Sequence, residues 1–215
     1  VKMTGLQVGK EYTLKATPMD VETGKPILNQ NKPVMIEHTF VATKSNEDIP
    51  VEILVNTSEY KNKKINIFEE LYDEGVLIAE HKDLKDENQT IEIKDVKIGT
   101  TAIANDTNTK FSKYGDKTIL TDTVKFKNVI PNLEYMVVGT IMDRKSGLPI
   151  IVNEQTVSAS TTFTPTEENG NIDVTFEFDS NELKGKDIVI YESLLYKGDI
   201  VANHNEITDK DQTID

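Results

Sequence analysis

The chain has 215 residues, of which 37% are hydrophobic and 28% charged, and its formal net charge is −13. This acidic balance argues against nucleic acid and anionic membranes as partners, because both bind basic surfaces. The absence of cysteine excludes disulfides, cysteine-ligated zinc and thiol catalysis. No run of about 18 apolar residues predicts a membrane span.

An internal repeat organises the sequence. A shift of 123 residues pairs residues 1–92 with 124–215 without a gap, and 31 of these 92 pairs are identical. We therefore expect a duplicated domain, with one copy over residues 1–95 and the other over 96–215. The chain opens on Val1 rather than methionine, so we expect it to be a segment of a longer polypeptide.

The second copy has a lead-in at residues 96–123, and the equivalent of this lead-in in the first copy would precede Val1. The lead-in contains KIGTTAIAND (97–106) and YGDKTILTDT (114–123), and the strand candidates that follow it are YMVVGTI (135–141), IDVTFEF (172–178) and DIVIY (187–191). They are short and rich in β-branched and aromatic residues. Turn signals separate them, at DRKSGLP (143–149), EENGN (167–171) and LKGKD (183–187).

Alternation with a period of two is clearest in residues 172–178, where every second residue is apolar. Short strands with frequent turns, and no long helical pattern, are typical of a β-sandwich. The sequence therefore predicts an all-β protein of two tandem Ig-like β-sandwich domains. The first of these is expected to lack its N-terminal strand.

A histidine precedes a Gln-Thr pair by eight residues in each copy, at His81 with Gln89 and at His204 with Gln212. Singly, each could be an ordinary hydrogen-bonded polar residue at a strand end. Identity in both copies, while most other positions differ, favours a shared role. Glutamine is a poor metal ligand, so we expect no metal and no cofactor. The hydrolase elbow GxSxG, the zinc motif HExxH and the P-loop are absent.

Six motifs occur in a fixed order in the second copy: IxTxA (98–102), TDTV (121–124), MDxxxG (142–147), TTFTP (161–165), VIYExL (189–194) and VAxH…DxxQT (201–213). This set resembles the VaFE-type repeat, the Thr–Gln intramolecular ester-bond domains of Gram-positive surface adhesins, including those of clostridia. The similarity covers residues 97–215 as a whole module and 1–92 as a truncated one.

The resemblance implies a self-formed ester between Thr100 on the first strand and Gln212 on the last, with His204, Asp122 and Glu192 assisting. Imidazole would accept the hydroxyl proton. Two buried carboxyl groups would share one proton and stabilise the oxyanion, and ammonia would leave. Each domain reacts once, so the protein is not expected to be an enzyme.

Two assignments stay open in the sequence. Strand alternation favours Thr100 over Thr101, because Ile98 and Thr100 share one face. Glu177 and Glu182 are alternatives to Glu192. Of these three, only Glu182 and Glu192 have a glutamate at the equivalent position of the first copy.

The first copy holds an incomplete site of Glu69, His81 and Gln89, since its threonine and aspartate would precede Val1. Gln89 is therefore expected to be unreacted, unless another chain donates a strand in trans to residues 1–95.

The expected function is that of a stalk module in an extracellular, cell-wall-anchored adhesin or pilus-like protein. Its partners would be neighbouring repeats of the same polypeptide, with no membrane insertion in this segment, and another domain would bind the host receptor. Two alternatives remain: a ligand-binding sandwich without a cross-link, and a hydrolase that uses Asp122 and Glu192 as its carboxylate pair.

Overall fold

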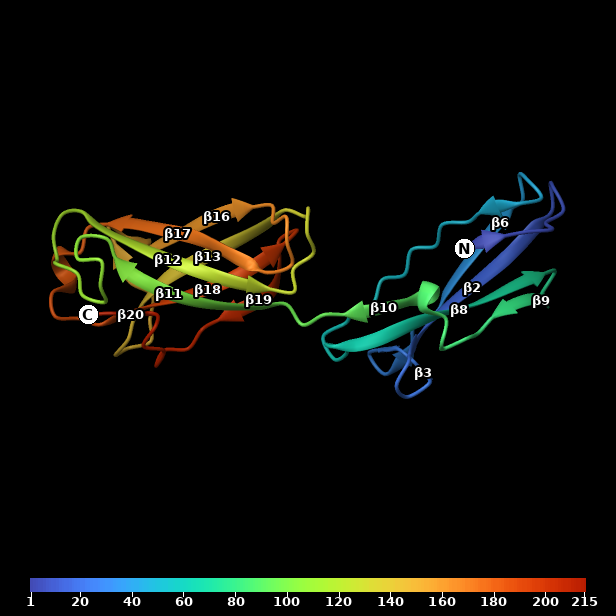
Figure 1. The fold of residues 1–215 in the computed structure, drawn as a ribbon, viewed down its shortest axis with the longest axis horizontal. Helices are drawn as coiled ribbons and strands as arrows, with labels where there is room; N and C mark the ends of the chain where they lie inside the picture. Colours follow the sequence, from blue (N-terminus) through green and yellow to red (C-terminus); the bar gives the residue numbers. More distant parts are fainter. The chain divides into compact units, whose positions relative to one another are not determined.

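A computed structural model describes all 215 residues of the chain. Its regular structure consists of β-strands and two 3-10 helices, Glu87–Gln89 and Asn181–Leu183, so the all-β prediction is confirmed. The chain divides into two compact units, residues 1–95 and 96–215, whose strands are labelled in Figure 1. No helix has the length and apolar character needed to span a membrane.

The second unit packs two antiparallel sheets face to face. One sheet has the order β11 (Lys97–Ala104), β12 (Thr118–Lys127) and β17 (Gly170–Phe178). The other has the order β16 (Ser158–Phe163), β13 (Tyr135–Asp143), β18 (Ile188–Tyr196) and β19 (Asp199–His204). The short strand β20 (Thr213–Ile214) also pairs with β18, and β14 (Ile151–Val152) forms a small hairpin with β15 (Gln155–Thr156).

The core of the second unit lies between these sheets. The predicted alternation is present in β17, where Val174, Phe176 and Phe178 are buried and Ile172 is half-buried. The sheets approach closely at Gly139 of β13, where an added Cβ would lie 2.5 Å from the Phe176 ring. Glycine at this position therefore makes room for the ring.

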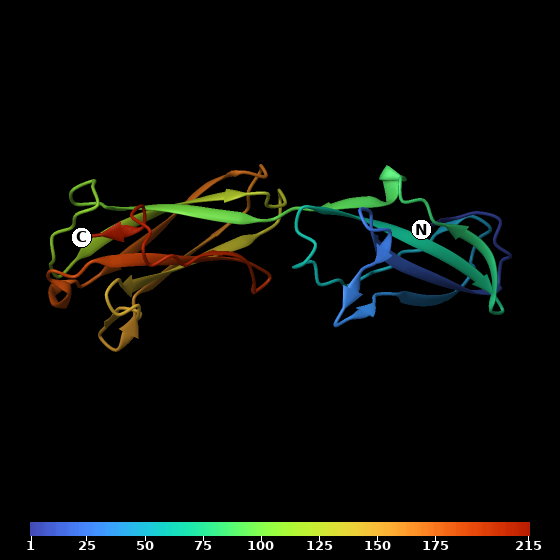
Figure 2. The same cartoon turned by 90° about the horizontal axis from the view of Figure 1, so that it is seen from below.

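The C-terminal segment of the second unit closes the gap between the two sheets. The Ala102 N–H in β11 donates to the Asp211 carbonyl at 2.9 Å, and the Ile190 N–H in β18 donates to the Gln212 carbonyl at 3.3 Å. Figure 2 shows this red segment beside the green β11. Gln212 is thereby held between a strand of each sheet.

The first unit is built around one large sheet with the order β10 (Thr90–Ile93), β8 (Lys63–Asp73), β2 (Glu11–Asp20) and β3 (Lys25–Pro26). Strand β6 (Ile36–Val41) also pairs with β2, and β9 (Val76–His81) with β8. Two short pairs complete it: β1 (Lys2–Met3) with β7 (Glu47–Asp48), and β4 (Leu28–Asn29) with β5 (Lys32–Pro33).

The β1–β7 pair corresponds to the part of the second unit in which the end of β12 pairs with the beginning of β17. Lys2 lies opposite Asp48, as Lys125 lies opposite Asn171 in the second unit. Beyond β7, residues 51–57 form no strand, and Leu54 is 88% exposed. The counterpart of the β11–β12–β17 sheet in this unit is therefore a two-residue pair.

Candidate functional site

A threonine hydroxyl and a glutamine carboxamide touch inside the second unit. Thr100 lies on the inward face of β11 with Ala102 and Ala104, while Thr101 is half-buried on the other face. Gln212 immediately precedes β20 and is fully buried, and its Nε2 donates a hydrogen bond to Thr100 Oγ1. The two residues are 112 positions apart in sequence, so the fold alone brings these groups together.

Two carboxyl groups lie beside this pair, and both are fully buried. Glu192 projects from β18 and accepts a hydrogen bond from Gln212 Nε2, and its carboxyl group also interacts with the Thr100 hydroxyl. Asp122 projects from β12, opposite Ala102 of β11, and contacts the Glu192 carboxyl group. One hydroxyl, one carboxamide and two acids thus share one buried space.

The electrostatics of the two acids favour a shared proton. Burial, and then the neighbouring Asp122 carboxyl, raise the pKa of Glu192 to about 11. Burial also raises the pKa of Asp122, against the opposing effects of Glu192 and of the Lys110 charge. Neither Asp122 carboxylate oxygen makes a hydrogen bond of normal geometry, although the Thr101 N–H is close enough to lower the pKa of Asp122. A proton between the acids gives one of these oxygens a hydrogen bond and avoids two buried negative charges.

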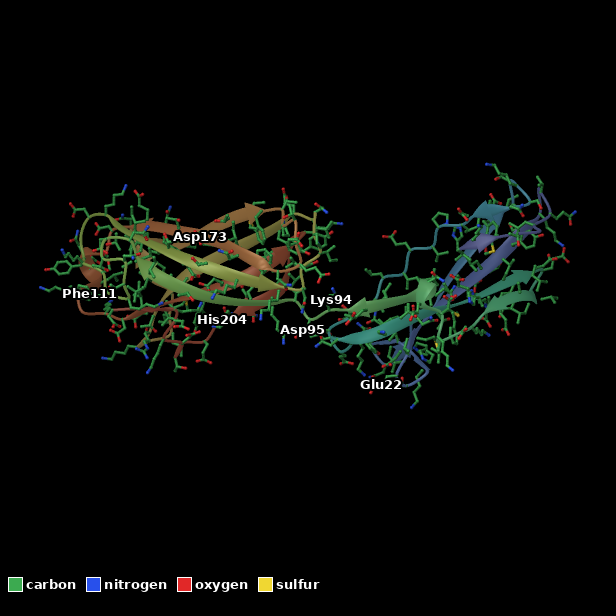
Figure 3. All side chains as sticks on the ribbon, in the orientation of Figure 1. Glu22, Lys94, Asp95, Phe111, Asp173 and His204 are labelled. Atoms are coloured by element: carbon green, nitrogen blue, oxygen red, sulfur yellow. The ribbon has the colours of Figure 1, made fainter.

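His204 lies at the end of β19, directly opposite Glu192 in the β18–β19 ladder. Figure 3 labels it on the β11 and β19 side of the unit. Its Nε2 lies 2.8 Å from Asp209 Oδ2, and the ring makes no hydrogen bond to Thr100. The structure thus puts His204 next to the acid that contacts the reacting pair, on a strand that lies against β11.

Asp209 was not singled out by the sequence, although a signal for it was present. An aspartate follows the histidine by five residues in both copies, as Asp86 after His81 and Asp209 after His204. In the first unit His81 Nε2 lies 3.1 Å from Asp86 Oδ2. A carboxylate at this distance orients the imidazole ring.

The alternative acids lie away from this space. Glu177 is exposed and forms an ion pair with Lys117 at 2.9 Å. Glu182 is exposed in the 3-10 helix Asn181–Leu183. Neither is a member of the buried set.

The first unit contains half of the same arrangement. Gln89 Nε2 donates to Glu69 Oε2 at 2.7 Å, and Glu69 lies opposite His81 in the β8–β9 ladder. Gln89 and Glu69 are only half-buried. No threonine hydroxyl hydrogen-bonds to the Gln89 carboxamide in this chain.

The second unit is thus a β-sandwich in which a hydroxyl nucleophile, a carboxamide and a proton-sharing acid pair meet in a buried space. A family model described as "T-Q ester bond containing domain" matches residues 1–93 and again 96–215. The chain belongs to this family, and both halves are members of it.

Among solved structures, a bacterial adhesin from Mobiluncus mulieris that contains intramolecular disulfide, isopeptide and ester bond cross-links is 19% identical, with a TM-score of 0.45. The alignment covers 56% of this chain and 56% of that one. A glycosyl hydrolase family 2 member from Bacteroides cellulosilyticus is 9% identical over 94% of this chain and 25% of that one, with a TM-score of 0.38. No curated protein matches the chain.

Proposed function

We propose that residues 96–215 form a structural module that cross-links itself, by an ester between Thr100 Oγ1 and Gln212 Cδ. The contact between these two buried side chains is the observation that carries this proposal. Such contact replaces an encounter in solution by a held geometry, which can contribute about 7–11 kcal/mol to lowering a barrier.

The reaction moves one proton and breaks one bond. Thr100 Oγ1 loses its proton and attacks Gln212 Cδ, the C–N bond breaks, and the nitrogen leaves as ammonia with the proton that the hydroxyl gave up. Glu192 touches both Thr100 and Gln212 Nε2, so the acid pair it forms with Asp122 is suited to carry this proton. A neutral Glu192 also donates a hydrogen bond to the oxyanion when the carboxamide is turned with its oxygen toward the acid.

His204 is proposed as the base that keeps the acid pair in its singly protonated state, with Asp209 orienting its ring. This role follows from its place opposite Glu192 and its contact with Asp209. Burial of Thr100, Gln212 and the two acids keeps bulk water from the ester and so protects it from hydrolysis. Since each domain reacts once, the activity is maturation and not turnover.

The chain belongs to the ester-bond domain family, and a bacterial adhesin also contains an ester bond cross-link. This shared cross-link supports a place for the module on an extracellular surface. We propose a stalk role, in which the module separates a binding domain from the cell wall to which the whole protein is anchored. A bond between the first and last strands suits that role, because it carries a pulling force through covalent bonds and leaves the sheets unloaded.

The test compares the intact mass of the chain with those of Thr100→Ala and Gln212→Ala. The expected result is a wild-type mass lower than the sequence mass by one ammonia, and no deficit in either variant. Thr101→Ala is the matched control and should keep the deficit, because that side chain lies on the other face of β11. A wild-type mass equal to the mass calculated from the sequence would contradict the proposed ester.

The hydrolase alternative needs an open cleft beside Asp122 and Glu192, and both side chains are fully buried. The ligand-binding alternative has one feature in its favour. A pocket of about 340 Å³ at one end of the second unit is lined by Phe111 and Tyr114, which are 56% and 54% exposed, and Figure 3 labels Phe111 at this end. If this pocket binds a ligand, Phe111→Ala with Tyr114→Ala should reduce attachment to host cells without changing the ammonia deficit.

A further inference from the structure

A lysine in the loop after β11 ties that loop to the C-terminal segment. Residues 105–117 connect β11 to β12, and Lys110 lies near the middle of this loop. Its Nζ donates hydrogen bonds to the Ala102 carbonyl at 2.5 Å and to the Asp211 carbonyl. Its own carbonyl accepts a hydrogen bond from the Asp215 N–H at 2.7 Å.

These bonds flank the two reacting side chains. Ala102 follows Thr100 by two residues on the same face of β11, and Asp211 directly precedes Gln212. The Asp211 carbonyl accepts from both the Lys110 ammonium and the Ala102 N–H. One cation therefore fixes how far the C-terminal segment slides along β11, and so which β11 side chain faces Gln212.

The same cation acts on the charge of the site. Three titratable groups face the Asp122 carboxyl: Glu192 from β18, His204 from β19 and Lys110 from the loop. The backbone N–H of Thr101 also lowers the pKa of Asp122. The positive charge of Lys110 lowers the pKa of Asp122, against the burial that raises it. Burial in turn lowers the pKa of Lys110, while Asp211, Asp122 and Asp209 favour its charged form.

We propose that Lys110 is a positioning residue for ester formation, which holds Gln212 against Thr100 through two backbone carbonyls and keeps one acid of the Asp122–Glu192 pair ionised by its charge. The proposal rests on the proposed function, since it assigns a role within that reaction. Ionisation of one acid matters because a pair that holds two protons has no carboxylate left to accept the proton of Thr100.

The experiment measures how fast the full chain loses ammonia after folding. Unfolded chain, collected in concentrated urea, is diluted into buffers from about pH 5 to about pH 9 and quenched with acid at set times for intact-mass analysis. Wild type is compared with Lys110→Met, which removes the charge, and with Lys110→Arg, which keeps it. Lys113→Met is the control, because Lys113 is an exposed lysine of the same loop.

Lys110→Met is expected to react at least about tenfold more slowly, and the acid limb of its rate profile should move to higher pH. That shift follows because the Asp122 carboxyl loses the cation that favours its ionised form. Lys110→Arg should return the limb to its wild-type position, and Lys113→Met should match wild type. A role in packing alone would slow the reaction equally at every pH.

Circular dichroism of each variant checks that the sheets form. If Lys110→Met does not fold, Lys110→Gln replaces it, because its amide can donate to the same carbonyls without a charge; the same shifted limb is expected. A Lys110→Met or Lys110→Gln profile that coincides with wild type overturns the role of Lys110 while the ester stands. Absence of ammonia loss from wild type overturns the proposed function itself.

Discussion

At the scale of single residues, the buried acids make the second unit sensitive to pH. Both acids have pKa values raised by burial, that of Glu192 to about 11 from an ordinary value of 4.5. The folded unit therefore binds more protons than the unfolded chain throughout the range between these two values. By linkage, stability is highest below the unfolded pKa and falls as pH rises toward the folded one.

This linkage gives a prediction for chains that lack the cross-link. In Thr100→Ala, the denaturant midpoint of the second unit should fall as pH rises from about 5 to about 8. Adding Glu192→Gln should flatten this dependence, because the glutamine has no proton to lose. The acids with lowered pKa values, such as Asp20 and Asp143, titrate below this range. A midpoint that rises with pH, or a slope that Glu192→Gln leaves unchanged, would contradict the raised pKa values.

The inward-facing threonine could be predicted from strand alternation, and the histidine and glutamine from the repeat. Lys110 could not, because its contacts join a loop to a segment 101 residues away and the loop has no periodicity to place it. The position equivalent to Lys110 in the first copy would precede Val1. The two copies therefore cannot be compared at this position. Asp209 could have been found from its identity in both copies.

At the scale of elements, the contact between Gly139 of β13 and Phe176 of β17 sets the spacing of the two sheets. The equivalent position in the first unit is Ala16, and that of Phe176 is Ile53. Ile53 lies in residues 51–57, which form no strand. A Cβ is therefore tolerated where no ring crosses over it.

Gly139→Ala should destabilise the second unit by about 1–3 kcal/mol, because the ring must leave its position in a packed core. Chemical denaturation monitored by circular dichroism measures the loss. Gly99→Ala, also in a strand but with no atom within 4 Å of the added Cβ, should cost much less. The double variant Gly139→Ala with Phe176→Leu should recover part of the loss. Equal effects of the two alanines would refute this account of the sheet spacing.

Residues 51–57 also mark a limit of sequence-based prediction. Residues 51–55 read VEILV and are rich in the β-branched residues typical of strands, yet they form none. A strand needs a neighbour to satisfy its backbone N–H and C=O groups. In the second unit β12 supplies that neighbour to β17, whereas β1 is only two residues long. Local sequence indicates the capacity to form a strand, and the partner decides the outcome.

The half-site in the first unit gives a further prediction. Gln89 contacts Glu69 but no threonine hydroxyl, so the 215-residue chain should lose one ammonia and not two. Mass analysis of proteolytic peptides should place the loss at Gln212 and leave Gln89 intact. We propose that a strand supplied to residues 1–95, by a longer polypeptide or by another chain, would complete that site. A deficit of two ammonia molecules would contradict this prediction.

At the scale of the whole molecule, the proposed ester closes a loop from residue 100 to residue 212. By analogy with disulfides, closing a loop of about 100 residues stabilises the folded state by about 4–5 kcal/mol through the unfolded chain. Thr100→Ala should therefore lower the unfolding free energy of the second unit by about this amount, as measured by denaturant titration. The first unit, which we expect to lack the bond, is the internal control and should unfold at the same denaturant concentration in both proteins.

The position of Gln212 also governs when the module can be completed. The segment from Asp211 to Asp215 is the last of this unit to leave the ribosome, and it supplies both the carboxamide and the carbonyl that Lys110 and Ala102 bind. A nascent chain that ends just before this segment would contain all the other residues of the site and still could not form the ester. The ester would then mark a completed module, separating finished modules from truncated ones by their resistance to proteases.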